Sequence, residues 1–440
     1  MGKFLGGLNV NRRQVLQGGA AAGLVALAAP KAWGQNKPEK LVLVCENSIA
    51  WKRTLIEEVA PAFEKENGIK IEFTMLPVDA WRARLKAELS AGSTGIDIAM
   101  LSVQMSGWMA PHLLDHNEVA AKITERDPDF DWGDFLEGGK KAGTYEGKLV
   151  GIPYRLTAQI LHYQKELLAQ AGFAQAPQTF AEFAKAALAV NSPPDRYGFG
   201  LTGKQGAATF TNAVPWIFSA GGRLVDFDTG EIFIDSDKAA EGLQFYADLL
   251  LKEKVVPPEA MTWEFDDLIA GAQNDKYAMS ATFSSYGTLF NDPKLSKTAG
   301  RWAWSTMPGS PTKEDNRTLI DGQFMAISKY SQNADWATEF LRMACSKDAM
   351  LRSMEGGNAP PRSSSLLNPD MVAKLGWPAA AAEAINTGIP ISSNAAWDGL
   401  ELSLRTGVSE ALLGQKTAKD ALRDVADDWQ RNLRRAGIIK

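Results

Sequence analysis

The chain has 440 residues, 45% of them hydrophobic and 22% charged, and its formal net charge is −5. This length predicts two or three domains, and the composition is that of an ordinary globular chain rather than a disordered or polytopic membrane protein. A nucleic-acid-binding protein usually carries a basic surplus, so no nucleic-acid partner is expected. Two cysteines and three histidines are too few for a disulfide framework or a cysteine-rich zinc site.

Residues 1–34 have the pattern of a secretory signal peptide. Arg12 and Arg13 precede an apolar run over 18–29, which is too short to span a bilayer, and a small-x-small segment ends at Gly34. The adjacent arginines indicate the twin-arginine export route. All four charged residues of this segment are basic, so its removal would take the net charge from −5 to −9. We therefore expect a soluble periplasmic protein, cut after Gly34 and without a lipid anchor, because no cysteine follows the cut.

The mature chain opens with alternating strand and helix patterns. Continuous apolar runs indicate strands covered on both faces, and apolar residues at helical spacing indicate the intervening helices. In chain order we expect a strand at 41–45, a helix at 52–66 ended by Gly68, a strand at 69–74, a helix around 81–89 closed by Gly92, and a strand at 96–101. This order predicts the start of a doubly wound parallel α/β sheet, in which ligands bind beyond the carboxyl ends of strands.

The rest of the chain mixes strand and helix patterns without an internal repeat. We expect strands at 159–163, 197–201, 278–281 and 324–327, a helix ending near Gly172, and helices at 179–190, 238–252, 334–345, 397–413 and 418–435. Thr179 with Glu182 forms a capping box at the start of its helix. Gly and Pro clusters at 151–153, 308–309 and 356–357 mark three crossings between domains. Three crossings predict two lobes of interleaved segments, joined by a hinge.

Three motifs with possible chemistry have simpler interpretations. Residues 198–203 match the spacing of a dinucleotide-binding loop, but they do not follow a first strand and open a helix, so a glycine-rich strand end is favoured. His112 and His116 lie four residues apart, yet no glutamate follows His112 as a zincin requires. Cys45 lies in an apolar strand, where a buried inert thiol is expected, and its pairing with Cys345 stays open. No catalytic triad stands out, but a glycosidase needs only two spaced carboxylates, so that class stays open.

Two stretches are similar to a known family. Residues 143–154 read GTYEGKLVGIPY, and residues 160–172 read ILHYQKELLAQAG. They resemble the region where family 1 extracellular solute-binding proteins enter their second lobe. Shorter matches occur in family order at 97–100, 177–180, 219–222 with Leu224, 276–279, 326–329 and 358–362. The chain resembles the carbohydrate-binding members, such as maltose-, trehalose- and glycerol phosphate-binding proteins, more than the amino-acid or metal groups.

The resemblance implies an α/β, two-lobed periplasmic-binding-protein fold of the type II kind, with doubly wound mixed sheets and a multi-segment hinge. Residues 38–152 and 312–352 would form the first lobe, and residues 153–311 and 353–440 the second. It also implies a monomeric receptor that captures a sugar, sugar alcohol or related derivative and delivers it to an inner-membrane ABC permease, with no cofactor, metal or catalytic activity. The alternatives are a periplasmic carbohydrate-acting hydrolase on the same scaffold and a chemoreceptor-only sugar sensor.

The ligand is expected between the lobes, because sugar sites combine aromatic walls with amides, carboxylates and arginine. The candidate ligand-binding residues follow expected strands or crossings: Glu46, Asn47, Ser48, Trp51, Gln104, Tyr154, Arg155, Asn212, Trp216, Gly222, Phe283, Ser284, Ser285, Tyr286, Gly322, Gln323, Arg362 and Trp397. Gln104 stands where maltose binders carry an acidic residue, and residues 283–286 replace the family's Trp-containing loop. Core packing is the alternative for Trp216 and Trp397. Arg155 and Arg362 leave an anionic sugar derivative open.

Overall fold

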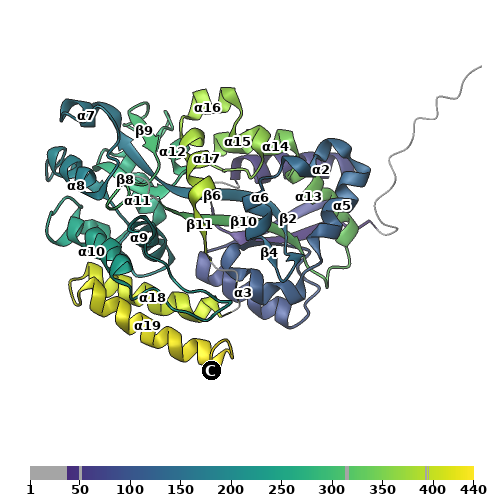
Figure 1. Ribbon diagram of the computed structural model, residues 1–440. Coiled ribbons are helices and arrows are strands. Elements are labelled where there is room, and N and C mark those ends of the chain that lie inside the picture. Colours follow the sequence, from purple (N-terminus) through teal and green to yellow (C-terminus); the bar gives the residue numbers. More distant parts are fainter. Residues whose placement is uncertain (1–36, 49–51, 313–316, 392–393, 395) are drawn as a thin grey trace, which may run out of the picture. The chain divides into compact units, whose positions relative to one another are not determined.

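The computed structural model describes residues 37–48, 52–312, 317–391, 394 and 396–440, so the expected signal peptide and Trp51 lie outside the described residues. A sheet of nine strands runs through the described part in the order β2-β1-β3-β10-β6-β8-β7, with β11 beside β10 and β9 beside β6 (Figure 1). The strands are β1 (Lys40–Glu46), β2 (Lys70–Leu76), β3 (Ile98–Ser102), β6 (Ile152–Gln164), β7 (Tyr197–Gly200), β8 (Tyr277–Phe283), β9 (Trp302–Ser305), β10 (Leu319–Ile327) and β11 (Ile389–Pro390). A separate hairpin pairs β4 (Thr144–Tyr145) with β5 (Lys148–Leu149).

Helices pack around this sheet. The first helical element of the described chain is a π-helical segment, η1 (Lys52–Val59), which leads directly into α2. The longer helices are α2 (Ala60–Asn67), α3 (Val78–Ser90), α5 (His116–Arg126), α8 (Phe180–Ala189), α9 (Ala207–Ser219), α10 (Asp237–Leu251), α11 (Phe265–Gln273), α13 (Ala334–Ala344), α17 (Trp377–Thr387), α18 (Trp397–Leu412) and α19 (Ala418–Arg435). The shorter helices are α4 (Ser106–Met109), α6 (Glu137–Ala142), α7 (Lys165–Gln170), α12 (Tyr286–Phe290), α14 (Lys347–Ser353), α15 (Ser363–Leu366) and α16 (Pro369–Leu375). Of the described helices, none is long and apolar enough to cross a membrane.

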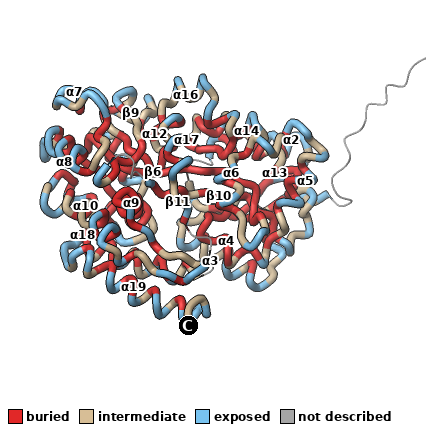
Figure 2. The backbone as a smooth tube through the Cα atoms, viewed as in Figure 1, coloured by how far each residue is buried: buried red, intermediate tan, exposed pale blue. Residues whose placement is uncertain are grey.

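The first lobe is the part of the chain packed around β1, β2 and β3. These strands are parallel, and β10 continues the sheet antiparallel to β3. Successive side chains of a strand point to opposite faces, so Leu43 packs on one side with α2, α5 and α13, while Val44 packs on the other side with α3. Both faces are therefore covered, as the continuous apolar runs predict: β3 is buried along its whole length, and Figure 2 shows β10 largely buried, whereas the edge strand β2 is partly exposed.

The second lobe is the part packed around β7, β8 and β9. Strands β7 and β8 are parallel, and β6 and β8 are antiparallel. The larger core cluster of this lobe joins β8 to helices α8, α9 and α10 and also to α18 and α19, near the end of the chain. Figure 1 shows α19 beside α10, although the two helices are far apart in sequence. A smaller cluster joins the other face of β6 to α17.

Two long strands, β6 and β10, belong to both lobes. The start of β6 pairs with β10, where Pro153 lies opposite Phe324, and the end of β6 pairs with β8 and β9. β10 in turn pairs with β3 in the first lobe. Both strands thus continue from one lobe into the other. The lobe boundaries expected at 152, 311 and 352 stay predictions. The two-lobed α/β architecture and its mixed sheet are confirmed.

The elements expected from the sequence are present, with ends shifted by a few residues. Gly68 (φ 63°) and Gly92 (φ 70°) have the left-handed conformation that a helix stop needs. Thr179 caps α8 by accepting from the backbone N of Glu182, while Glu182 itself accepts from Gln178 rather than from Thr179. The main element missed is α9. Nearly all of its residues are buried, so it has no amphipathic stripe for a pattern to detect.

Candidate ligand-binding site

One group of the candidate residues meets where β1 ends beside the two crossing strands. Glu46 is the last residue of β1, and its Oε1 accepts a hydrogen bond of 2.6 Å from Nε2 of Gln323 on β10. Gln323 lies opposite Arg155 in the register of β10 and β6. A carboxylate, an amide and a guanidinium are therefore held side by side by the sheet itself.

Arg155 connects this group to the second lobe. Its Nη2 donates to Ser285 Oγ at 3.1 Å, and its guanidinium carbon lies 5.3 Å from the ring centre of Phe283, a cation–π distance. Arg155 is buried at 6% exposure. Burial strengthens such bonds because water is excluded from them, so Arg155 can hold a polar ligand group in a fixed geometry.

The segment after β8 supplies hydroxyls and aromatic surface. Ser284 Oγ lies 3.0 Å from Thr157 Oγ1 on β6, and the Ser284 backbone N donates to Ala158 O at 2.9 Å. Phe283 and Tyr286 pack with Phe265 as three rings with centroid separations of 5.3, 5.6 and 5.9 Å. The loop that replaces the family's Trp-containing loop thus still presents two aromatic side chains, Phe283 and Tyr286, both of which were predicted. The third ring, Phe265 at the start of α11, was not predicted.

Two charged residues at this place were missed by the sequence analysis. Asp321 lies on β10 two residues before Gln323, and its Oδ1 is buried without a hydrogen-bond partner among the described residues. Burial raises the pKa of Asp321 to about 6, and the charges of Arg155 and Arg82 oppose this rise. Arg82 lies on α3. A charged residue within the apolar strand 319–327 was the available signal for Asp321, whereas Arg82 reads as one of many charges on an exposed helix face.

The pKa of Glu46 is also raised by burial, and three neighbours oppose the rise: its hydrogen bond from Gln323 and the charges of Arg155 and Arg82. The pKa of Tyr286 is raised by burial as well. Glu46, Asp321, Arg155 and Arg82 together make two carboxyl groups and two guanidinium groups within one electrostatic neighbourhood. The site is polar and charge-balanced, with aromatic rings at its second-lobe side.

Four other candidates lie on the elements that frame this group. Gln104 follows β3 in a single 3₁₀ turn, and its Oε1 is buried without a hydrogen-bond partner among the described residues. Gly322 lies on β10 opposite Leu156. Asn47 is exposed and donates its backbone N–H to Leu76 O at 2.7 Å, and Ser48 follows it. These four stay predictions with positions compatible with ligand contact.

Five candidates lie in packed interior positions instead. Trp216 is fully buried among Phe180, Phe183 and other rings of the second-lobe core, and Trp397 is fully buried beside Trp429. These surroundings favour the core-packing alternative for both tryptophans. The other three are Asn212, which donates to Thr202 Oγ1 at 2.7 Å, Gly222, where an added Cβ would lie 2.8 Å from Ala239 Cα, and Tyr154, which packs in the first-lobe core.

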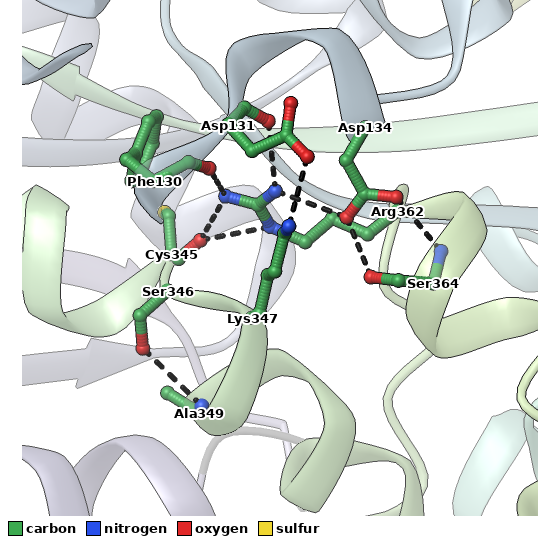
Figure 3. A network of polar contacts seen from close by, with 9 residues as sticks. All are labelled: Phe130, Asp131, Asp134, Cys345, Ser346, Lys347, Ala349, Arg362 and Ser364. Carbon is green, nitrogen blue, oxygen red and sulfur yellow. Dashed lines mark hydrogen bonds and ion pairs between the residues drawn. The ribbon is translucent and has the colours of Figure 1, made fainter. Parts of the chain in front are cut away.

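The guanidinium of Arg362 is bound by protein groups instead of facing a ligand site (Figure 3). Its guanidinium donates to the carbonyls of Phe130 (2.7 Å), Asp131 (3.2 Å) and Cys345 (2.8 and 3.1 Å), and it forms an ion pair of 3.1 Å with Asp134. It is fully buried. Figure 3 shows it among these protein groups, so Arg362 ties the segment after Pro361 to residues 130–134 and to Cys345.

The motifs interpreted as structural are structural. Gly198 and Gly200 lie in β7, where an added Cβ at Gly198 would lie 2.2 Å from Ala187 O. His116 Nε2 accepts from the Ile327 backbone N at 2.8 Å, and burial lowers its pKa to about 4. Cys45 and Cys345 are buried and unpaired, and burial raises the pKa of each thiol to about 12.

The comparisons with known proteins decide the family. The family model of the bacterial extracellular solute-binding proteins matches residues 48–351, which is more than half of the chain. The chain belongs to this family. The resemblance stated for residues 143–172 is therefore confirmed, and the family consists of binding proteins rather than enzymes.

Individual relatives of this solute-binding protein are distant. A probable ABC transporter-binding protein of Deinococcus radiodurans is 26% identical over 64% of this chain and 66% of its own length. The mannitol-binding protein of Pseudomonas aeruginosa is 22% identical over 88% of this chain and 91% of its own length. Among solved structures, maltose-bound T. maritima MalE3 superposes with a TM-score of 0.80 at 23% identity, covering 89% of this chain and 99% of that one. At this identity the structural likeness shows the fold, and the two lobes with it.

Proposed function

We propose that this solute-binding protein captures a neutral sugar or sugar alcohol between its two lobes and delivers it to an inner-membrane ABC permease. The observation that carries the proposal is the contact of Arg155 with Ser285 beside the Glu46–Gln323 pair. These side chains come from the first-lobe edge, from both crossing strands and from the second lobe. Hydroxyl groups need such mixed donors and acceptors, and the rings of Phe265, Phe283 and Tyr286 suit an apolar C–H face.

The charge of the site favours a neutral ligand over a sugar phosphate or sugar acid. Arg155 and Arg362 are the two cations that made an anionic ligand conceivable from the sequence. Arg362 is paired with Asp134 and donates to backbone carbonyls, so it does not contribute a charge to the site. The other, Arg155, shares its surroundings with two carboxyl groups, Glu46 and Asp321. An anionic ligand would meet these carboxylates without an unbalanced cation to offset them.

Export and partners belong to the same proposal. The pattern at Arg12 and Arg13 supports twin-arginine export to the periplasm, with removal of residues 1–34. The Deinococcus relative is described as an ABC transporter-binding protein, and the Pseudomonas relative as a mannitol-binding protein. The first description supports a receptor that works with an ABC permease, and the second supports a polyol as ligand. We propose that the receptor acts as a monomer.

A ligand screen tests the proposal. Purified protein is screened by thermal shift and calorimetry against mannitol, maltose, glycerol 3-phosphate and glutamate, with the ligand recovered and analysed for turnover. We expect a neutral polyol or sugar to bind and to be recovered unchanged. A ligand at about 100 times its Kd adds about 2.7 kcal/mol of stability, which is several degrees in Tm. Preference for the phosphate or the amino acid would contradict the proposed ligand class, and turnover would favour the hydrolase alternative.

Arg155→Ala tests the site itself. Removing a buried donor to the ligand should cost about 2–3 kcal/mol, or roughly thirty- to a hundredfold in Kd. The matched control is Arg352→Ala, which removes an exposed arginine paired with Glu58 and Asp348 on the first lobe. It should change Kd less than about twofold. Equal Kd values for the parent and Arg155→Ala would remove Arg155 from the site.

A further inference from the structure

Helices α3 and α18 belong to different lobes and meet through charged side chains. α3 is held in the first lobe, since Trp81, Leu85 and Leu89 are buried against β1 and β3 and Trp81 Nε1 donates to Met100 O at 3.0 Å. α18 is held in the second lobe, since Leu400 and Leu404 are buried in its core. A movement of one lobe against the other must therefore move these helices apart or together.

Three ion pairs connect the two helices. Arg82 Nη1 lies 3.4 Å from Glu401 Oε1, Lys86 Nζ lies 3.5 Å from Asp398 Oδ2, and Arg405 Nη1 lies 3.7 Å from Asp79 Oδ1. Arg82, Lys86 and Asp79 are on α3, and Asp398, Glu401 and Arg405 are on α18. Each helix contributes charges of both signs, and every pair joins opposite signs.

Glu401 is the centre of this interface. Its side chain is 2% exposed, and it accepts from Trp397 Nε1 at 3.0 Å and from Arg405 Nε at 3.0 Å within its own helix. A buried carboxylate is stabilised only when it is well paired. Arg82 adds a partner from the opposite lobe, so the carboxylate is better paired when the helices are together.

The charge of Arg82 also acts on both Glu46 and Asp321, the two carboxyl groups of the candidate site.

We propose that the three α3–α18 ion pairs form a latch that stabilises the arrangement in which the two lobes lie close together, with the buried Arg82–Glu401 pair at its centre. The proposal deepens the proposed function, since it concerns how that site is closed. The latch acts on the lobes themselves and does not depend on which ligand is bound.

The test measures the distance between the lobes in free protein. Spin labels are placed at Glu125→Cys on α5 and Lys185→Cys on α8, two exposed positions on different lobes. The native cysteines are buried with raised pKa values, so they should not react with the label. Arg82→Gln should lower the ratio of short to long distances about threefold to tenfold, because it leaves Glu401 one partner short.

The matched control lies on the same helix. Arg84→Gln removes the same charge from α3, but the partner of Arg84 is Glu88 on α3 itself, at 2.7 Å. It should leave the distance distribution as in the parent. The latch is overturned if Arg82→Gln leaves the distribution unchanged, or if Arg84→Gln shifts it as much.

A charge exchange at the exposed pair provides a second test that does not disturb the buried carboxylate. Lys86→Asp and Asp398→Lys each place like charges across the interface. Each should lower the ratio of short to long spin-label distances about twofold. The double variant restores opposite charges and should return toward the parent. Additive lengthening in the double variant would contradict the latch. All these measurements use free protein, so failure of the ligand screen leaves them interpretable.

Discussion

At the residue scale, Arg155 and Arg362 show that one side-chain type serves two purposes. Both are buried, and both were predicted to contact ligand. Arg362 has its donors taken up by three backbone carbonyls and Asp134, and its pKa is lowered by burial. Arg155 lies on a crossing strand and contacts a hydroxyl of the second lobe, Ser285 Oγ. What surrounds a guanidinium therefore decides its role, and a short motif such as Asn-Ala-Pro-Pro-Arg cannot show those surroundings.

Arg362→Ala should lower the stability of the folded protein rather than its ligand affinity. The substitution leaves the carbonyls of Phe130 and Cys345 and the carboxylate of Asp134 buried without their partner, which should cost about 3–5 kcal/mol. The measurement is the urea midpoint, with Arg352→Ala as an exposed control that should change stability by less than about 1 kcal/mol. An unchanged midpoint with lost binding would return Arg362 to the ligand site.

Asp321 should make the free protein less stable as the pH rises. Burial raises the pKa of Asp321 to about 6 from an ordinary value of 3.8, so the folded state binds more protons than the unfolded state between these values. The free energy of unfolding therefore falls as the pH rises through this window. Above it, the ionised carboxyl should cost on the order of 1–2 kcal/mol, because the side chain is only partly shielded from water.

Asp321→Asn should remove that cost. Its urea midpoint should exceed that of the parent at pH 8 and approach it at pH 4. The control is Asp129→Asn, at an exposed position, which should follow the parent at both values. A stability difference that is the same at pH 4 and pH 8 would contradict the raised pKa.

At the element scale, close packing of strands and helices explains residues that resemble functional motifs. β7 lies against α8 so closely that an added Cβ at Gly198 would reach Ala187 O and C at 2.2 and 2.8 Å. Gly200 and Gly203 are equally confined, by the Tyr277 ring and by the backbone of Ala260 and Met261, so the glycine spacing of a dinucleotide loop arises here from close packing. The same scale explains α9, which is buried all round and carries Pro215 inside it, so that neither periodicity nor propensity predicts it.

Gly198→Ala should destabilise the second lobe. The backbone of α8 must move to admit the methyl group, at a cost of about 1–3 kcal/mol. Gly138→Ala is the matched control, since Gly138 lies in α6 and an added Cβ there has nothing within 4 Å. Alanine is the better helix former, so the control should be neutral or stabilising by up to about 1 kcal/mol. Equal urea midpoints for Gly198→Ala and the parent would contradict the packing.

At the scale of the whole molecule, β6 and β10 make the two lobes one continuous sheet. β10 pairs with β3 in the first lobe, and β6 pairs with β8 and β9 in the second. Because β6 and β10 run through both lobes, a hinge motion must bend these two strands instead of a flexible linker. The register between β10 and β6 shifts between Gln323 and Phe324, which is where a strand bends most readily.

Ligand should therefore draw the lobes together about this region. Scattering from free protein and from protein saturated with the ligand found in the screen should show a smaller radius of gyration when bound. A sugar from the same screen that does not bind serves as the control. An unchanged radius at a calorimetrically saturated site would count against closure.

The sequence by itself determined most of the elements and their order, with the fully buried helix α9 as the main exception. Apolar runs and helical stripes reflect local burial, so they placed β1, β2, β3 and the terminal helix α19, whose bounds agree with the expected 418–435. They also led to the family, since its motifs are short segments read along the chain. Glu46 was found because ligands in this fold bind where strands end. Arg155 and Gln323 were found because the family resemblance and the Gly and Pro clusters indicate crossings between the lobes there.

Only the tertiary structure decided which residues meet. Arg82 and Phe265 lie far apart in sequence, and nothing local distinguishes them from other charges and rings. Asp321 has one local signal, a charge within an apolar strand, but this signal does not show which residues it meets. Trp216, Trp397 and Arg362 stand at positions where the sequence predicts ligand contact, but they lie in packed interiors. The physical reason is that burial, pairing and pKa depend on contacts between distant segments, such as α3 with α18 and β10 with both lobes. A pattern along the chain records which face of an element is apolar, but not which other element covers it.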